Sequence, residues 1–124
     1  MRSVGLIVGL GLLAAAGCGQ EGPLPQVQGQ VFYHGRPLPG GTIVFTPDPE
    51  RGGRGELACG EIQPDGRYVL HTGEDLGAVA GWHRVTVAAA PATGLPRKYR
   101  DPELSGQSCE VKAGQLNTID LHLD

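Results

Sequence analysis

Three cysteines, Cys18, Cys59 and Cys109, are the side chains of this sequence with the widest chemistry, because a thiolate is both a nucleophile and a metal ligand. The first of them follows an uncharged run of 14 residues, 4–17, that has a basic residue before it. A membrane-spanning helix needs about 20 apolar residues. A basic start, a short apolar stretch and small residues before a cut are instead typical of a signal peptide. We therefore predict that residues 1–17 are a signal peptide.

The end of this run, Ala16, Gly17 and Cys18, resembles the lipobox of bacterial lipoproteins, in which the cysteine is lipidated and becomes the first residue. The preceding alanine departs from that pattern, which more often has leucine there. The resemblance implies that acyl chains on Cys18 hold the protein at a membrane, with residues 18–26 as lipidated N-terminus and tether. Gly19 stands where an aspartate would resemble an inner-membrane retention signal, which favours the outer membrane if the cell has two membranes. Plain secretion and an uncleaved anchor are the alternatives.

The other two cysteines, Cys59 and Cys109, lie in predicted strands of an exported chain, and export places thiols where disulfides persist. They are therefore a candidate disulfide, which would close a loop of about 50 residues. Such a bridge requires the two Cα atoms to lie within roughly 4.4 to 6.8 Å of each other. Two buried free thiols that act as small apolar side chains are the alternative.

Two groups of polar residues have the types, but not the full number, that a metal site needs. His71 and Glu74 have the spacing of a metallocarboxypeptidase zinc pair, yet a catalytic zinc needs three protein ligands and an open position. Asp48 and Glu50 bring two carboxylates, whereas calcium takes about six to eight oxygens. The two serines after the signal peptide lack the Gly-x-Ser-x-Gly turn of a serine nucleophile. We therefore expect no enzyme, no metal and no cofactor, with a metal-dependent hydrolase as the remote alternative.

One basic cluster, Arg97, Lys98 and Arg100 around Tyr99, stands out in an otherwise acidic chain. The net charge is −3, and it becomes −4 once the signal peptide and its single arginine are removed. This balance argues against nucleic acid as a partner. The cluster is a candidate contact surface for lipid phosphates, an anionic envelope polymer or an envelope protein, with Tyr99 stacking on the ligand. In the alternative, Tyr99 anchors a loop while the cations extend into water.

Beyond residue 26, short runs of alternating apolar and polar residues are separated by glycine and proline, which predicts half-buried strands. We expect these strands at 27–33, 42–46, 57–62, 67–72, 82–89, 108–113 and 117–123. The alternation places Ile43 and Phe45 on one face of their strand, and Val85 and Val87 on one face of theirs. In the last strand the apolar face consists of Ile119, Leu121 and Leu123. The segment "QPDG" predicts a tight turn with Gly66 at positive φ, which would join the third and fourth strands as a hairpin. Gly114 would centre a second hairpin between the last two. The pattern predicts an all-β fold, an antiparallel β-sandwich of about seven strands.

Five segments resemble, in order and spacing, small bacterial lipoproteins with a carboxypeptidase-regulatory-like, transthyretin-like (prealbumin-like) domain: "VQGQVFYHGRPLPGGTIVF", "IQPDGRYVL", "GWHRVTV", "LPRKYRDPELSG" and "VKAGQLNTIDLHL". The resemblance implies a β-sandwich at 27–124, held on the cell envelope and without an established activity. It implies a non-catalytic binding or scaffolding module. The alternative is a subunit that joins an envelope complex by pairing strand edges.

Overall fold

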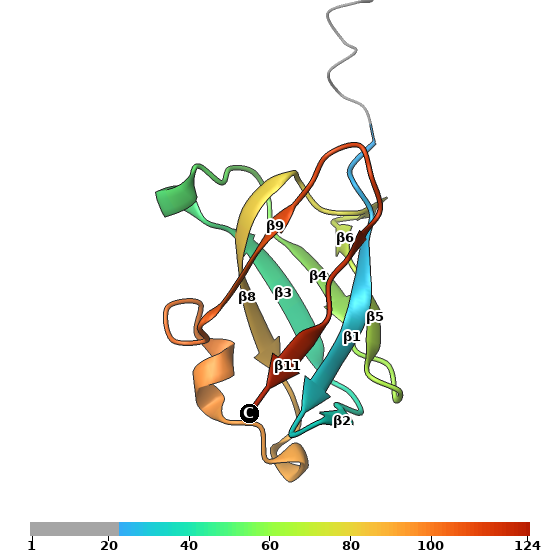
Figure 1. The fold of residues 1–124 in the computed structure, drawn as a ribbon, viewed down its shortest axis with the longest axis vertical. Helices are drawn as coiled ribbons and strands as arrows, with labels where there is room; N and C mark the ends of the chain where they lie inside the picture. Colours follow the sequence, from blue (N-terminus) through green and yellow to red (C-terminus); the bar gives the residue numbers. More distant parts are fainter. Residues whose placement is uncertain (1–22) are drawn as a thin grey trace, which may run out of the picture.

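A computed structural model describes residues 23–124 and shows an all-β fold of two facing sheets, as in a β-sandwich (Figure 1). The described residues form eleven short strands: β1 (Val27–Tyr33), β2 (Arg36–Pro37), β3 (Thr42–Pro47), β4 (Ala58–Glu61), β5 (Arg67–Val69), β6 (His71–Thr72), β7 (Asp75–Leu76), β8 (Gly81–Ala88), β9 (Gln107–Val111), β10 (Asn117–Thr118) and β11 (Leu121–Leu123). Three 3-10 helices lie in the connections: η2 (Pro49–Arg51), η3 (Pro91–Thr93) and η4 (Arg97–Arg100).

The larger sheet has the strand order β7-β6-β4-β3-β8-β9, and all its neighbouring strands are antiparallel. Its two longest strands, β3 and β8, pair Ile43 with Val87 and Phe45 with Val85, and all four side chains are buried. Because successive side chains of a strand point to opposite faces of the sheet, the residues that alternate with these four along β3 and β8 lie on the outer face. The expected inward positions of these two strands are thus confirmed.

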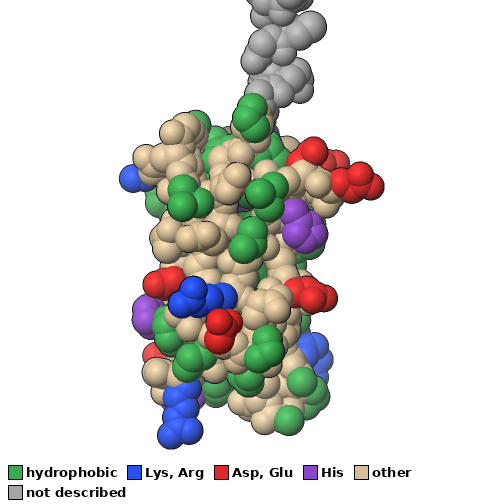
Figure 2. All heavy atoms as spheres, turned by 90° about the vertical axis from the view of Figure 1, so that its right-hand side faces the viewer, with side chains coloured by type: hydrophobic (Ala, Val, Ile, Leu, Met, Phe, Trp, Pro, Cys, Tyr) green, Lys and Arg blue, Asp and Glu red, His purple; other side chains and the backbone are tan. Residues whose placement is uncertain are grey.

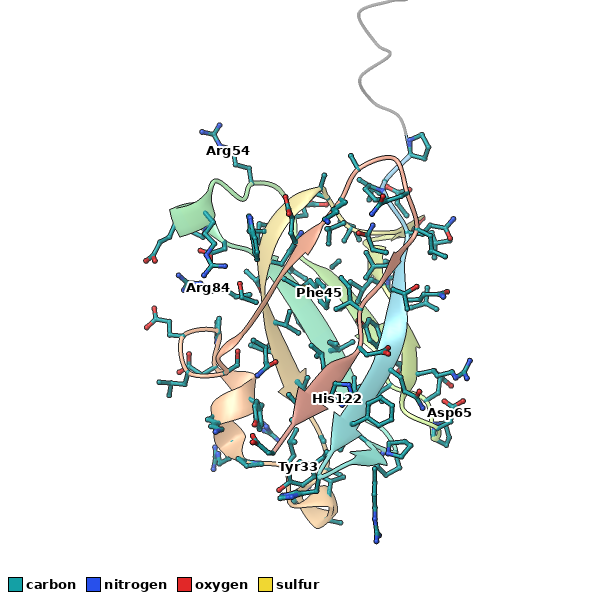
Figure 3. The ribbon with its side chains drawn as sticks, in the orientation of Figure 1. Tyr33, Phe45, Arg54, Asp65, Arg84 and His122 are labelled. Carbon is teal, nitrogen blue, oxygen red and sulfur yellow. The ribbon has the colours of Figure 1, made fainter. Side chains whose placement is uncertain are left out.

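The smaller sheet is built around β1, which pairs antiparallel with β2 and β5. On its other side β1 pairs parallel with β10 and β11, so the prediction of a wholly antiparallel fold is wrong there. The inward side chains of this sheet, among them Val27, Val31 and Leu121, close the core against Phe45 and its neighbours. Figure 3 shows Phe45 between the two layers.

The two predicted hairpins are wrong, because the chain changes sheets at both places. After the turn at 63–66, β5 pairs with β1 of the smaller sheet, and only at His71 does the chain return to pair with Cys59 of β4. Similarly, β9 belongs to the larger sheet, whereas β10 and β11 belong to the smaller one. The side chain of Asn117 spans this second crossing, accepting from the Lys112 N–H and donating to the Lys112 carbonyl.

The turn at 63–66 itself is as predicted. Gly66 has φ 87°, and its N–H donates to the Gln63 carbonyl at 2.8 Å. A Cβ on Gly66 would also press against the carbonyl oxygen of Val31, which accepts a hydrogen bond from Leu38. Glycine is therefore required here both for its backbone conformation and for the space it leaves.

Candidate functional site

The predicted lipidation site, Cys18, lies outside the described residues, as does the predicted signal peptide 1–17. The described chain begins beside the sandwich, where Leu24 and Pro25 pack over Gly77. The Pro25 carbonyl accepts a hydrogen bond from the Ala78 N–H at 3.0 Å, and the Gln26 carbonyl accepts one from the Asn117 N–H at 2.8 Å. The last two residues of the predicted tether, Pro25 and Gln26, are therefore hydrogen-bonded to the end of the sandwich.

The candidate disulfide between Cys59 and Cys109 is wrong, and both thiols are free. β4 and β9 are separated by β3 and β8, so about 14 Å lies between the two positions at the usual strand spacing, beyond the reach of a bridge. Their side chains also lie on opposite faces, since Cys59 pairs with the outward Val44 while Cys109 packs against the core. Burial raises the pKa of the Cys109 thiol to about 12.

The basic cluster forms the helix η4, and only part of it is available for contact. Arg97, Lys98 and Arg100 are exposed, but Tyr99 is 2% exposed. The Tyr99 hydroxyl donates to the Asp124 carbonyl at 2.8 Å and accepts from the Asp124 N–H at 3.1 Å. Tyr99 therefore anchors the loop, as in the alternative, and its place in the predicted contact surface is wrong.

The residues considered for metals are not gathered into a site. His71 Nδ1 lies 3.1 Å from the carbonyl oxygen of Gly73, within its own turn. Asp48 caps the helix η2, where its carboxylate accepts from the Glu50 N–H at 3.0 Å. Within residues 23–124, no three His, Cys, Asp or Glu side chains are close enough together to hold a metal ion.

The most organised polar site in the described chain is a cleft that we call the Arg84 cleft, of about 480 Å³. Its walls are the η2 loop, the outer face of β8 and the segment 102–108. Figure 3 shows Arg84 projecting between these two loops. Arg84 Nη2 lies 3.3 Å from Oδ1 of Asp48 and 3.2 Å from Oε1 of Glu50. The Asp48 carboxylate, through its hydrogen bond, raises the pKa of Arg84 above its ordinary value.

The two acidic partners of Arg84 differ sharply in burial. The Asp48 side chain is 5% exposed, while the Glu50 side chain is 81% exposed. The Asp48 backbone also holds the loop in place, because its N–H donates to the Trp82 carbonyl and its own carbonyl accepts from Gly53. Asp48 is thus a buried part of the cleft, whereas Glu50 is a surface side chain.

A second arginine, Arg51, closes one side of the Arg84 cleft. Its Nη1 donates to the Ser108 hydroxyl at 3.0 Å, and its guanidinium carbon lies 4.7 Å from the centre of the Trp82 ring. The contact with Trp82 is a cation–π interaction. These contacts orient the guanidinium along the wall of the cleft.

Sequence reasoning missed this cleft, although one signal for each of its parts is present. The alternation of β8 places Arg84 on the same face as Trp82, and an aspartate before a proline is a frequent helix cap. Nothing in the spacing, however, brings residue 48 beside residue 84. Pairing of β3 with β8, which matches Thr46 with Arg84, is what joins them.

Searches for similar proteins found no matching family model, no matching curated protein and no matching solved structure. Between residues 23 and 124, no helix is both long enough and apolar enough to cross a membrane.

Proposed function

We propose that this chain is an envelope-anchored lipoprotein whose transthyretin-like β-sandwich binds a partner and does not catalyse a reaction. The lipobox-like residues before Cys18 and the five family-like segments support the anchor and the domain type. The two-sheet all-β fold agrees with that domain type at the level of architecture. The outer membrane is the favoured location in a cell with two membranes.

The observation that carries the binding function is the unequal pair of carboxylates on Arg84. Displacing the exposed Glu50 side chain costs little, since an exposed ion pair contributes only about 0 to 1 kcal/mol. The buried Asp48 would keep the guanidinium in place during the exchange. A planar guanidinium held in this way suits a carboxylate ligand. We therefore assign the cleft to a carboxylate group of an envelope protein or an anionic envelope polymer.

Titration of the soluble domain, residues 19–124, with a tetraglutamate peptide tests this assignment. Backbone NMR shifts should move around Arg84 and Arg51, and a tetraglutamine peptide should not move them. Arg84→Gln should abolish the response, while Glu50→Gln should strengthen it because the carboxylate nearest the guanidinium on the exposed side is gone. Glu103, which also lines the cleft, remains in this variant. Arg67→Gln is the matched control, since Arg67 lies in β5 of the smaller sheet, is 73% exposed and pairs with Asp65 of the preceding turn. An unchanged response in Arg84→Gln would contradict the assignment.

The anchor is tested separately by mass spectrometry of the N-terminal peptide from membranes. Lipid should be found on Cys18, with residues 1–17 removed. A Cys18→Ser protein should leave the membrane fraction. A peptide that begins at Met1, or an unmodified Cys18 in the membrane fraction, would contradict the proposed anchor.

A second candidate function, a subunit that pairs strand edges, is favoured by β9. This strand ends the larger sheet and has five residues, whereas β7 at the opposite edge has two. The Trp82 carbonyl faces β3, because it accepts from the Asp48 N–H. Backbone groups of successive residues point to opposite sides of a strand, so those of Trp82 and Arg84 both face β3 and not β9. Their partners on β9, Glu110 and Ser108, therefore point their N–H and C=O groups away from β8, where a partner strand can hydrogen-bond to them.

Glu110→Pro tests the edge-pairing function, because proline removes an outward N–H and is tolerated on edge strands. Partners captured from membranes by the full-length protein should be lost in this variant if they bind along β9. Retention of the same partners in Glu110→Pro would contradict edge pairing.

A further inference from the structure

Apolar side chains surround the point where the described chain begins. Two hollows of about 530 and 400 Å³ flank Leu24; Leu76 and Val79 line the first, and Leu116 lines the second. We call these four residues the leucine rim. Figure 2 shows hydrophobic side chains on the surface at this end of the molecule.

The exposure of the rim is unusual for this molecule. Leu76 is 51% exposed and Leu116 is 55% exposed, and they are two of the five large apolar side chains most exposed in the described chain. Single exposed leucines need no explanation, but a group of them at one place marks a surface that contacts something else. Leu24 precedes β1, Leu76 ends β7, Val79 lies in the connection before β8, and Leu116 lies in the crossing after β9. These segments meet at the same end of the sandwich, because Leu24 lines both hollows (Figure 1).

The charges near the rim do not favour one sign of partner. Glu56 and Asp75 line the first hollow, and Arg54 extends from the same end of the molecule (Figure 3). Lys112 precedes the crossing that carries Leu116 and is exposed. With both signs present, the contact chemistry of this end is its apolar side chains.

The length of chain before Pro23 identifies the occupant. Only four residues, 19–22, separate Cys18 from Pro23, and five Cα–Cα steps extend at most about 18 Å. We infer that the leucine rim docks the sandwich on the lipid surface in which Cys18 is anchored; this inference rests on the proposed lipidation. Leucine side chains at such a surface enter the boundary between headgroups and acyl chains.

Docking would give the sandwich one orientation on the membrane. β8 has eight residues and is about 26 Å long, so the end opposite the rim stays in water. The basic helix η4 lies toward that end (Figure 1). The loop before β9 carries Leu104, which is 63% exposed, and lies beside the middle of β8, away from the rim. The Arg84 cleft lies on the side of the sandwich and opens along the membrane.

Single tryptophans placed in the lipidated full-length protein test the docking. Trp82, the only tryptophan of the chain, is replaced by phenylalanine throughout. Leu76→Trp and Leu116→Trp are then compared with Leu104→Trp in phosphatidylcholine vesicles with brominated acyl chains, which quench only nearby tryptophans. About half of the fluorescence should be lost at the two rim positions, and about a tenth or less at Leu104→Trp. Melting temperatures verify that all three variants fold.

Mass spectrometry of the same samples separates the two hypotheses. Lipid on Cys18 together with equal, weak quenching at all three positions would overturn the docking and leave the anchor intact. An unmodified Cys18 would overturn both. Blue-shifted but unquenched rim tryptophans would also overturn the docking, because they would show that another copy of this protein, in place of lipid, covers the rim.

Discussion

The Arg84 cleft and the leucine rim are both surface features, but their side chains are satisfied in opposite ways. In the cleft, Arg84 is paired with Asp48 and Glu50, and Arg51 is bonded to Ser108. In the rim, leucines that are about half exposed have nothing over them among the described residues. A ligand of the cleft must therefore replace an existing partner, whereas a ligand of the rim only has to exclude water.

The two features also differ in what a substitution should change, the stability of the fold or the contacts that the protein makes. The contacts of the cleft hold a loop onto the larger sheet, so changing its buried member should unfold part of the structure. The exposed side chains of the rim make few contacts with the core, so changing them should affect what the protein touches and not whether it folds. Four predictions follow this difference from the largest expected effect to the smallest.

Among changes at these two surface features, Asp48→Ala should have the largest effect, about 2 to 3 kcal/mol of lost unfolding free energy. The variant loses the cap of η2 and leaves the Glu50 N–H without its acceptor. Urea unfolding measures the change. Asp48→Asn, which keeps an acceptor oxygen, should lose less than Asp48→Ala. Equal losses in the two variants would show that the cap does not hold the loop.

Gly77→Ala should lower the unfolding free energy by about 1 to 2 kcal/mol and disturb the packing of Leu24, a residue of the leucine rim. Gly77 has φ 111°, and a Cβ there would collide with the Pro25 carbonyl oxygen and with Leu24. Hydrogen exchange should become faster at the Ala78 N–H, which donates to Pro25. Gly73→Ala is the matched control, because a Cβ at Gly73 has nothing within 4 Å, although φ is also positive. Equal exchange in both variants would contradict the packing of Leu24 and Pro25.

Alkaline pH should remove about 1 to 2 kcal/mol of stability by pH 10, through the core beneath the cleft. Burial raises the pKa of Cys109 to about 12, and burial also raises the pKa of Tyr68. The unfolded chain ionises at the ordinary values, 9.0 and 10.0, so the stabilisation is complete below about pH 9 and is lost as pH rises toward 12.

Urea unfolding between pH 7.5 and 10.5 measures this loss. The fall should become shallower in Cys109→Ala, because the shifted thiol is absent. Water entering between β8 and β9 would allow Cys109 to ionise in the folded state as well. A slope that is the same in Cys109→Ala and in the unmodified chain would therefore show that the strand under the cleft is open to water.

Leu76→Ser and Leu116→Ser should have the smallest effect, each within about 0.5 kcal/mol of the unmodified chain, because both side chains are about half exposed. Leu70→Ala is the contrast: Leu70 is fully buried, and its truncation should cost about 2 to 5 kcal/mol. Thermal unfolding of the three variants checks the order. A loss above about 1 kcal/mol at either rim leucine would mean that the rim is part of the core.

Local pattern was enough to predict where most strands lie and which of their residues are buried. The seven predicted runs overlap nine of the eleven described strands, with ends that differ by one or two residues, and the missed ones, β2 and β7, have two residues each. Alternation predicted Ile43, Phe45 and Val85 as inward, because a strand with one buried face must repeat every second residue. The buried positions of the last strand, Leu121 and Leu123, were found in the same way.

Strand pairing was not predictable from the same pattern. The tight turn at 63–66 formed as expected, yet the residues after it pair with β1 and not with the strand before it. Gly60 contributes to this outcome, because the absence of a Cβ lets the Val69 carbonyl approach β4 closely. A sequence shows that a glycine is present, but not which backbone comes to lie against it.

The sequence by itself determined the all-β class, the positive φ of Gly66 and the inward faces, because each depends on residues close together along the chain. Only the tertiary structure decided that Cys59 and Cys109 lie three strands apart, that Tyr99 is an anchor, and that Asp48 meets Arg84. Those relations depend on which strands become neighbours. Neighbours are selected by the packing of the whole core, which no short segment encodes.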